Sequence, residues 1–479
     1  MSENSILSVG IDIGTSTTQL VLSRLTIQNM ASSFSVPHIA ISKKEIIYRS
    51  NIMFTPLINQ YEIDYKKIEK FVSRQYQRAA IKKQDIQMGA IIITGETARK
   101  ENAEKVLKSL SHYAGDFVVA TAGPDLEGMI AAKGAGTSRY SKEKQAPVIN
   151  LDIGGGTTNL AAFDGDQVLD TACFDVGGRL IRLDPVTKEV TYLAPKVKQL
   201  INRLNLNIHE GRIITAKQLN PIIDTLVRIL ENSVGLGEKD SFFDLFVTNH
   251  SFSKLDPSQI KTVTFSGGVA DCLWSKSQDS PFKYDDIGVL LGRELRQSLI
   301  FNQKNVLHSK ETIRATVVGA GSYTIDVSGS TISYTQGVLP LRNIPILNIS
   351  VKKEKLNADS LAESIKNQLN WFRVKMELSN AAISLTGLKS PTFEELQSCA
   401  KGIIKGSSGL IDRRFPLIVI TYEDIAKALG HSLFAYLPPN YPFVCIDRVK
   451  VEHGDYIDLG EPIAHATVIP VSVKTLIFN

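Results

Sequence analysis

Two short apolar runs, each ending in an aspartate and a glycine-bearing turn, set the pattern of the first half of the chain. Residues 148–153 have the composition of a buried strand that carries Asp152 near its end, and residues 154–158 read Gly-Gly-Gly-Thr-Thr. Residues 9–18 repeat this order, with Asp12 followed by Ile-Gly-Thr-Ser-Thr-Thr. The chain that leaves each turn is again apolar and extended, so the pattern predicts two similar β-hairpins.

Both turns have the chemistry of a phosphate site. Glycine allows a close approach of the backbone to a ligand, and successive N–H groups in such a turn form an anion-binding nest. A carboxylate cannot itself face a phosphate, so Asp12 and Asp152 indicate a hard cation such as Mg²⁺ between them. Neither turn has the lysine of a P-loop or opens a helix. Two ordinary hairpin turns without a phosphate role are the alternative.

Three further segments rich in small residues accompany the turns. Residues 261–271 read as a strand that runs through Gly267-Gly268 into a helix, an arrangement that presents bare backbone to a ligand. Residues 124–136 and 315–322 read as small-residue helices that can cross closely, as at a hinge between domains. The polar, lysine-rich residues 138–145 predict an exposed loop.

Amphipathic and apolar patterns predict the remaining elements. Helices are expected at residues 65–78, 98–110, 195–206, 221–234 and 358–374. Strands are expected at residues 344–351, 417–420, 443–451, 456–459 and 463–478. Residues 421–424 resemble a capping box that would start a helix ending near residue 430. The residues after 340 therefore read as a separate α/β module that offers a partner or regulatory surface.

Composition excludes several classes of protein. A chain of 479 residues has room for two to three domains. The net charge of +5 comes without a long basic run, which argues against nucleic-acid binding. Four separated cysteines and no Cys-x-x-Cys motif fit a reducing compartment. We see no signal peptide and no apolar run long enough to span a membrane, so we expect a cytoplasmic protein.

Taken in order, five segments resemble the signature of the ATPase superfamily of actin, Hsp70 and sugar kinases. The segments are Asp12, residues 124–136, Asp152, Gly267-Gly268 and residues 319–321. The resemblance implies an α/β fold of two duplicated, ribonuclease H-like domains that bind ATP or ADP. We expect lobes at residues 1–140 and 141–339, followed by the additional C-terminal α/β module at residues 340–479.

A closer resemblance extends over nearly the whole chain. Residues 93–103, 122–136, 150–164, 265–272, 314–329 and 470–478 resemble the reactivating factors of ethanolamine ammonia-lyase. The resemblance implies a chaperone-like protein that uses ATP and Mg²⁺ to help the inactivated lyase release damaged cobalamin, so that intact adenosylcobalamin can enter. The lyase is then the expected partner, and a weak ATPase is expected rather than a metabolic enzyme. The resemblance leaves open a homodimer and an association with a bacterial microcompartment.

The resemblance also implies roles for single residues. Asp12 and Asp152 would hold Mg²⁺ through water, and Asp125 stands where the superfamily orients the attacking water. Because Asp125 is shorter than the Glu or Gln usual there, we expect slow turnover. The residues expected to contact the nucleotide are Gly14, Thr15, Ser16, Thr17, Gly154, Gly155, Gly156, Thr157, Gly267, Gly268 and Gly319.

Three alternatives within the superfamily stay open at this point. A small-molecule kinase would need a catalytic aspartate beside an acceptor pocket, and no further motif indicates a sugar or acid acceptor. A cytoskeletal filament protein would polymerise with ATP. A general Hsp70-like chaperone would need a peptide-binding module, which is not recognisable here.

Overall fold

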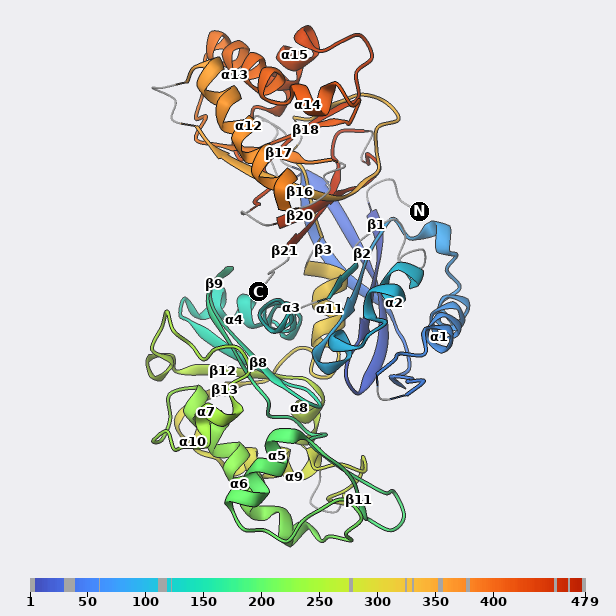
Figure 1. Cartoon of the computed structure of the whole chain (residues 1–479), viewed down its shortest axis with the longest axis vertical. Helices are drawn as coiled ribbons and strands as arrows, with labels where there is room; N and C mark the ends of the chain where they lie inside the picture. The colour runs from blue at the N-terminus through green and yellow to red at the C-terminus, as the bar shows by residue number, and fades with distance from the viewer. Residues whose placement is uncertain are drawn as a thin grey trace.

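The structure is a computed structural model of the chain (Figure 1). It describes residues 5–29, 39–59, 61–110, 119–121, 123–274, 279–323, 325–329, 331–351, 356–375, 380–451, 455–463 and 466–475. Within these residues the strands form four sheets, of which three are large and one has two strands. In the same ranges no helix is both long and apolar enough to cross a membrane.

The first large sheet has the strand order β3-β2-β1-β5-β6, with the short β4 paired to β2. β1, β2 and β3 form an antiparallel meander, whereas β5 and β6 lie parallel to β1. Helices α1 and α2 pack apolar side chains such as Phe71 and Val106 into the core beside it. The elements are β1 (Ser5–Ile13), β2 (Thr17–Asn29), β3 (Ile39–Arg49), β4 (Met53–Phe54), α1 (Tyr65–Arg78), β5 (Met88–Ile93), α2 (Ala103–Leu110) and β6 (Val119–Thr121).

The second large sheet repeats this topology. Its order is β13-β12-β7-β8-β9, with β7, β8 and β9 as the antiparallel meander and β12 and β13 parallel to β7. A meander of three strands extended by two parallel strands is the ribonuclease H-like arrangement, so the predicted duplicated actin-like fold is confirmed. The strands are β7 (Val148–Ile153), β8 (Thr158–Asp164), β9 (Gln167–Phe174), β12 (Thr262–Ser266) and β13 (Asn305–Leu307).

The elements around the second sheet build the largest apolar cluster. A two-stranded sheet joins β10 (Ile181–Leu183) to β11 (Val190–Leu193). The helices are α5 (Pro195–Arg203), α6 (Ala216–Ser233), α7 (Phe243–Phe246), α8 (Gly268–Cys272), α9 (Gly288–Gln297) and α10 (Leu299–Gln303).

Helices α3 (Pro124–Ala135) and α11 (Ala315–Tyr323) cross between the two sheets, as predicted (Figure 1). Each helix packs on the sheet other than the one whose strands come directly before it in the chain. α3 follows β6 and lies on β7, β8 and β9, whereas α11 follows β13 and lies on β1, β2 and β5. A β carbon on Gly134 would overlap the carbonyl oxygen of Ala315, and one on Gly319 would overlap that of Ile130. Glycine is therefore required for the two helix backbones to touch.

The third large sheet belongs to the C-terminal part of the chain. Its order is β14-β21-β20-β16-β17-β18-β19-β15, and β16 to β19 run parallel in sequence order. Alternate residues of β18 face opposite sides of this sheet. Val419 packs against helices α12, α13 and α15, whereas Ile418 and Ile420 pack in the apolar cluster on the other side. This arrangement confirms an additional α/β module.

The elements of this module follow α11 directly. They are β14 (Ile325–Val327), β15 (Ser333–Tyr334), β16 (Leu341–Ser350), α12 (Ala358–Lys375), β17 (Ala382–Thr386), α13 (Phe393–Gly406), α14 (Ser408–Ile411), β18 (Leu417–Thr421), α15 (Ala426–Tyr436), β19 (Phe443–Asp447), β20 (Asp455–Leu459) and β21 (Pro470–Thr475). β14 also lies beside β3 of the first sheet. The start of the module is thereby packed against the first half of the chain.

Two local predictions were wrong. Residues 138–145 are not a loop but lie almost wholly in helix α4 (Thr137–Lys144), because Thr137 and Ser141 are buried on its inner side. Thr421 does not cap a helix, since it is the last residue of β18. Helix α15 begins later, and the N–H of Ala426 donates instead to Asp447 Oδ2 at 3.3 Å. That cap comes from a distant strand, which no local pattern could reveal.

Candidate functional site

A cavity of about 410 Å³ lies between the first two large sheets. Both predicted turns line it, together with Gly267 and Gly268 at the start of α8. The structure brings together the following predicted residues around this cavity: Asp12, Gly14, Thr15, Ser16, Thr17, Asp152, Gly154, Gly155, Gly156, Thr157, Gly267 and Gly268.

The two turns have the same backbone geometry. Gly14 N–H donates to the carbonyl oxygen of Thr17 at 2.9 Å, and Gly154 N–H donates to that of Thr157, also at 2.9 Å. Each turn joins an antiparallel pair whose last matched residues are a buried isoleucine and a threonine. The sequence repeat is thus a structural repeat, with one copy on each side of the cavity.

Asp12 and Asp152 lie at equivalent positions on β1 and β7, and both are buried. Each accepts a hydrogen bond from the end of the neighbouring parallel strand. Thr94 Oγ1 donates to Asp12 Oδ1 at 3.2 Å, and Ser266 Oγ donates to Asp152 Oδ1 at 2.6 Å. These two hydroxyls were not identified from the sequence, because they depend on which strands pair.

A third buried carboxylate, that of Glu127, lines the same cavity. It comes from the first turn of α3, and its Oε2 accepts the N–H of Gly95 at 3.3 Å. Burial raises the pKa of Glu127 well above its ordinary value, and the charges of Asp152 and Asp12 add to this effect. Glu127 was missed in the sequence, where its neighbour Asp125 was preferred.

The carboxylates disfavour one another's ionised forms. Burial raises the pKa of Asp12 to about 7, with the charge of Asp152 adding to it, although the Thr94 hydrogen bond opposes the shift. Burial likewise raises the pKa of Asp152 to about 6 against the hydrogen bond from Ser266. Such a group of buried carboxylates is stabilised by a cation that replaces the missing solvent.

Two predicted residues lie elsewhere. Asp125 does not line the cavity: its Oδ1 accepts Thr171 Oγ1 at 2.6 Å and lies 3.1 Å from His250 Nε2, on the side of α3 that faces β9. Two positions along a helix correspond to a rotation of about 200°, so Asp125 and Glu127 point to opposite sides. Gly319 does not line the cavity either, because it is used in the contact between α3 and α11.

Gly267 and Gly268 form the floor of the cavity beside the second turn. Gly267 has a φ of 87°, and a β carbon there would overlap the carbonyl oxygen of Ile153. A residue with a side chain would therefore separate this segment from the end of β7. Asp271 and Cys272 of α8, the helix that begins at Gly268, line the cavity as well.

The residues that line the site suit a polyphosphate with a divalent cation. The two glycine turns line the cavity, and the burial that raises the pKa of Asp12 would be offset by a cation beside its carboxylate. Ser16 Oγ is buried and has no hydrogen-bond partner among the described residues, so a polar ligand would satisfy it. Within the same residues no three or more His, Cys, Asp or Glu side chains form a group arranged to ligate a metal ion directly.

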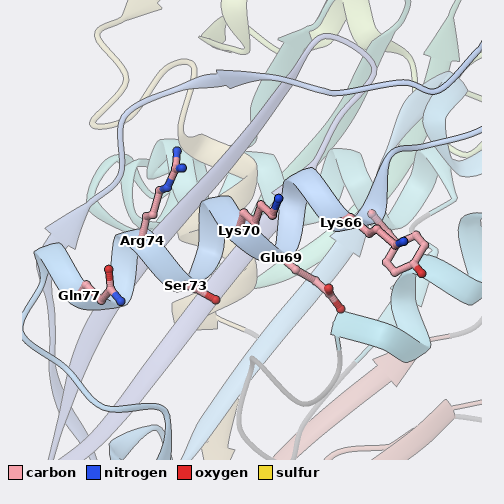
Figure 2. A pocket seen from close by; sticks show the side chains of 7 residues that line it. Lys66, Glu69, Lys70, Ser73, Arg74 and Gln77 are labelled. Carbon is pink, nitrogen blue, oxygen red and sulfur yellow. The ribbon is translucent and has the colours of Figure 1, made fainter.

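A second cavity, of about 530 Å³, is less suited to a ligand. Figure 2 shows that its labelled side chains all project from α1. The lining residues are Tyr65, Lys66, Glu69, Lys70, Ser73, Arg74 and Gln77, and among the described residues no second element faces them. We therefore assign function to the smaller cavity between the turns.

Comparison with known proteins places this geometry in a family context. The family model of the ethanolamine utilisation protein EutA matches residues 4–479. The chain is 35% identical over 483 residues to the ethanolamine ammonia-lyase reactivase EutA of Salmonella typhimurium, covering all of both chains. It is also 35% identical over 486 residues to the reactivase of the same name from Escherichia coli, again over both full lengths.

Solved structures resemble about two thirds of the chain. The PPX-GPPA enzyme of Aquifex aeolicus aligns with a TM-score of 0.40 and 15% identity, covering 66% of this chain and 99% of that one. The ethanolamine utilization protein EutJ of Carboxydothermus hydrogenoformans aligns with a TM-score of 0.34 and 14% identity, covering 66% and 89%.

Proposed function

Because the chain belongs to the family of the ethanolamine utilisation protein EutA, we propose that it reactivates ethanolamine ammonia-lyase. The observation that carries this function is the 35% identity to named reactivases over their full length. The match includes the C-terminal module, so it is not limited to the nucleotide-binding type of fold. The lyase is then the protein partner, and we place the two proteins together in the cytoplasm, where ethanolamine utilisation can include a microcompartment.

We further propose that the cavity between the turns binds ATP or ADP with Mg²⁺. Asp12 and Asp152 would hold the hydrated cation, and the N–H groups and hydroxyls of residues 14–17 and 154–157 would contact phosphates. Gly267 and Gly268 would flank the adenosine. The bound cation would supply the positive charge that the buried carboxylates lack, which their raised pKa values support.

Glu127 replaces Asp125 as the proposed residue that orients an attacking water. It lines the cavity next to both aspartates, whereas Asp125 is held by Thr171 and His250 outside it. A carboxylate with a raised pKa can accept a proton from water more readily than an ordinary one. Slow turnover was expected because Asp125 has a short side chain. Glu127 is longer, so this reason no longer applies.

The predicted division into lobes at residues 1–140 and 141–339, with a module at 340–479, is part of the same proposal, with the start of the module moved back to β14 and β15, which belong to the C-terminal sheet. Nucleotide would shift the balance between open and closed lobes only through a difference in affinity for the two states. The crossing of α3 and α11 would be the hinge. α11 ends at Tyr323 and β14, an edge strand of the C-terminal sheet, begins at Ile325, so movement of α11 would reach that sheet directly.

A recovery assay tests the function. Ethanolamine ammonia-lyase blocked with cyanocobalamin is incubated with this protein, adenosylcobalamin, Mg²⁺ and ATP, and ammonia release is then measured. We expect activity to return only when both the protein and ATP are present. No return of activity, with nucleotide binding intact, would contradict a reactivase function and leave a different role for the same fold.

A further inference from the structure

Arg179 contributes a positive charge to the cavity between the turns. Among the described residues that line it, Arg179 is the single cationic side chain, and five carboxylates line it as well. The five are Asp12, Glu127, Asp152, Asp271 and Asp286. A polyphosphate brought to this cavity therefore meets one fixed positive charge from the protein.

The backbone places Arg179 against the second turn. Its N–H donates to the carbonyl oxygen of Gly155 at 2.7 Å, and a β carbon on Gly155 would lie 3.5 Å from Arg179 Cδ. The preceding Gly177 makes this contact close, since a β carbon there would overlap the same carbonyl oxygen. The side chain of Arg179 thus starts beside the middle of the turn that we assign to phosphate.

The guanidinium of Arg179 reaches the opposite side of the cavity. Its central carbon lies 5.4 Å from the centroid of the Phe54 ring. Phe54 is on β4, where it pairs with Thr17 of the first turn. The contact therefore joins the two sheets across the cavity and brings Arg179 between both turns.

This guanidinium is half-buried, and the described part of the chain offers it no hydrogen bond or ion pair. Burial lowers its pKa, although the charge of Asp286 opposes the shift. Phe54 is 66% exposed, so the guanidinium can leave its ring without breaking a contact in the core. A planar guanidinium with free donors matches a phosphate in geometry and charge.

We propose that Arg179 binds the phosphate chain of the nucleotide, and that Phe54 holds its guanidinium when no phosphate is present. This inference rests on the proposed nucleotide function. The contact between Arg179 and Phe54 therefore competes with the ligand. When phosphate binds, the guanidinium leaves the ring, and its contact with the phosphate replaces its contact with Phe54 as the link between the lobes.

Calorimetric titration of the full chain with MgATP, MgADP and adenosine tests the first part. Arg179→Met should weaken the binding of MgATP and MgADP by about tenfold or more, because it removes the charged hydrogen-bond donors that the phosphates would accept. Adenosine should be bound within about twofold of wild type, which also shows that the variant is folded. Arg179→Lys keeps the charge but loses the fork of donors. Its affinity for MgATP should lie between those of the wild type and of Arg179→Met.

Arg182→Met is the matched control. Arg182 lies three residues further on, is exposed, and its guanidinium stacks over Tyr192 at 4.4 Å outside the cavity. The Arg182→Met variant should bind MgATP, MgADP and adenosine with the affinities of the wild type. Unchanged MgATP affinity in Arg179→Met, or an equal loss for adenosine, would overturn the role of Arg179. Absence of nucleotide binding by the wild-type chain would instead overturn the proposed function on which the inference rests.

Phe54→Ala tests the second part. Removing the ring should raise the affinity for MgATP by about two- to fivefold, the equivalent of a cation–π contact of about 0.5–1 kcal/mol. The same change in the Arg179→Met background should have no effect, because the two residues act as one pair. Weaker binding in Phe54→Ala, or an equal effect in both backgrounds, would overturn Phe54 as the resting partner.

Discussion

Ser16 and Gly155 bring the two turns of the cavity into contact. Ser16 Oγ occupies the space that a β carbon on Gly155 would need, and this hydroxyl has no hydrogen-bond partner among the described residues. One residue comes from the first sheet and the other from the second. The contact shows how closely the two halves of the cavity approach at the positions proposed for phosphate.

Gly155→Ala should therefore turn the Ser16 hydroxyl out of its position between the turns and bring a methyl group against Arg179. We expect MgATP affinity to fall by about tenfold, because both changes take place where phosphate is proposed to bind. Titration calorimetry measures the change. Gly123→Ala is the control, since a β carbon on Gly123 would meet nothing within 4 Å. If both variants bound MgATP as wild type does, the turns would not be the phosphate site.

Asp12→Asn and Asp152→Asn should each abolish Mg²⁺-dependent nucleotide binding, because each removes a charge from the proposed cation site. Without Mg²⁺ the same variants should melt at a higher temperature than wild type, since a buried carboxylate is replaced by a neutral amide in a cluster of like charges. Calorimetry and thermal melting measure the two effects. Normal Mg²⁺-dependent binding by both variants would contradict the assignment of the metal site.

Glu127→Gln should retain MgATP binding but slow phosphate release by about 100-fold, within the range that general base catalysis contributes. Asp125→Asn should hydrolyse ATP within about twofold of wild type. It should instead lower stability by about 1 kcal/mol, because it weakens the contacts with Thr171 and His250. Steady-state phosphate release and urea unfolding separate the two roles. The opposite pattern would restore Asp125 as the catalytic residue.

Gly319→Ala should destabilise the chain by about 1–3 kcal/mol through overpacking of the contact between α3 and α11. The new methyl group would overlap the carbonyl oxygen of Ile130. Urea unfolding measures the loss, with Gly123→Ala again as the reference. A stability equal to that reference would show that the helices have room to separate at this position.

The four cysteines should react slowly with thiol reagents in the native protein. All four are buried, and burial raises the pKa of Cys173, Cys272 and Cys399 to about 12. Because the thiolate is the reacting species, a raised pKa leaves little of it at pH 8. The rate should keep increasing above pH 9, and all four thiols should react at once in denaturant. Rapid native labelling of Cys272 would contradict the burial of its thiol in α8.

The features that could be predicted from sequence are those encoded locally. The hairpins around Asp12 and Asp152 follow from apolar strands and glycine turns, and their matching hydrogen bonds follow from the repeat. The crossing helices could be predicted because both segments are rich in glycine and alanine. Such small residues allow two helices to pack with their backbones in contact. These local signals were enough to indicate the duplicated fold.

The features that could not be predicted depend on tertiary contacts. Ser266 and Thr94 reach the aspartates only because β12 and β5 pair with β7 and β1. The choice between Asp125 and Glu127 depends on the rotation of α3, which its weak amphipathic pattern does not determine. Arg179 was available as the residue after Gly177-Gly178, but only the contacts with Gly155 and Phe54 reveal its position.

Release of cobalamin is the measurement that tests the central claim most directly. Ethanolamine ammonia-lyase carrying cyanocobalamin is mixed with the protein and MgATP, and the free cobalamin is separated from the lyase and measured by its absorption. We predict release with the wild-type chain, and none with Asp152→Asn or when Mg²⁺ is removed by chelation. Release that is equal for wild type and Asp152→Asn would contradict a reactivation driven by nucleotide bound between the two turns.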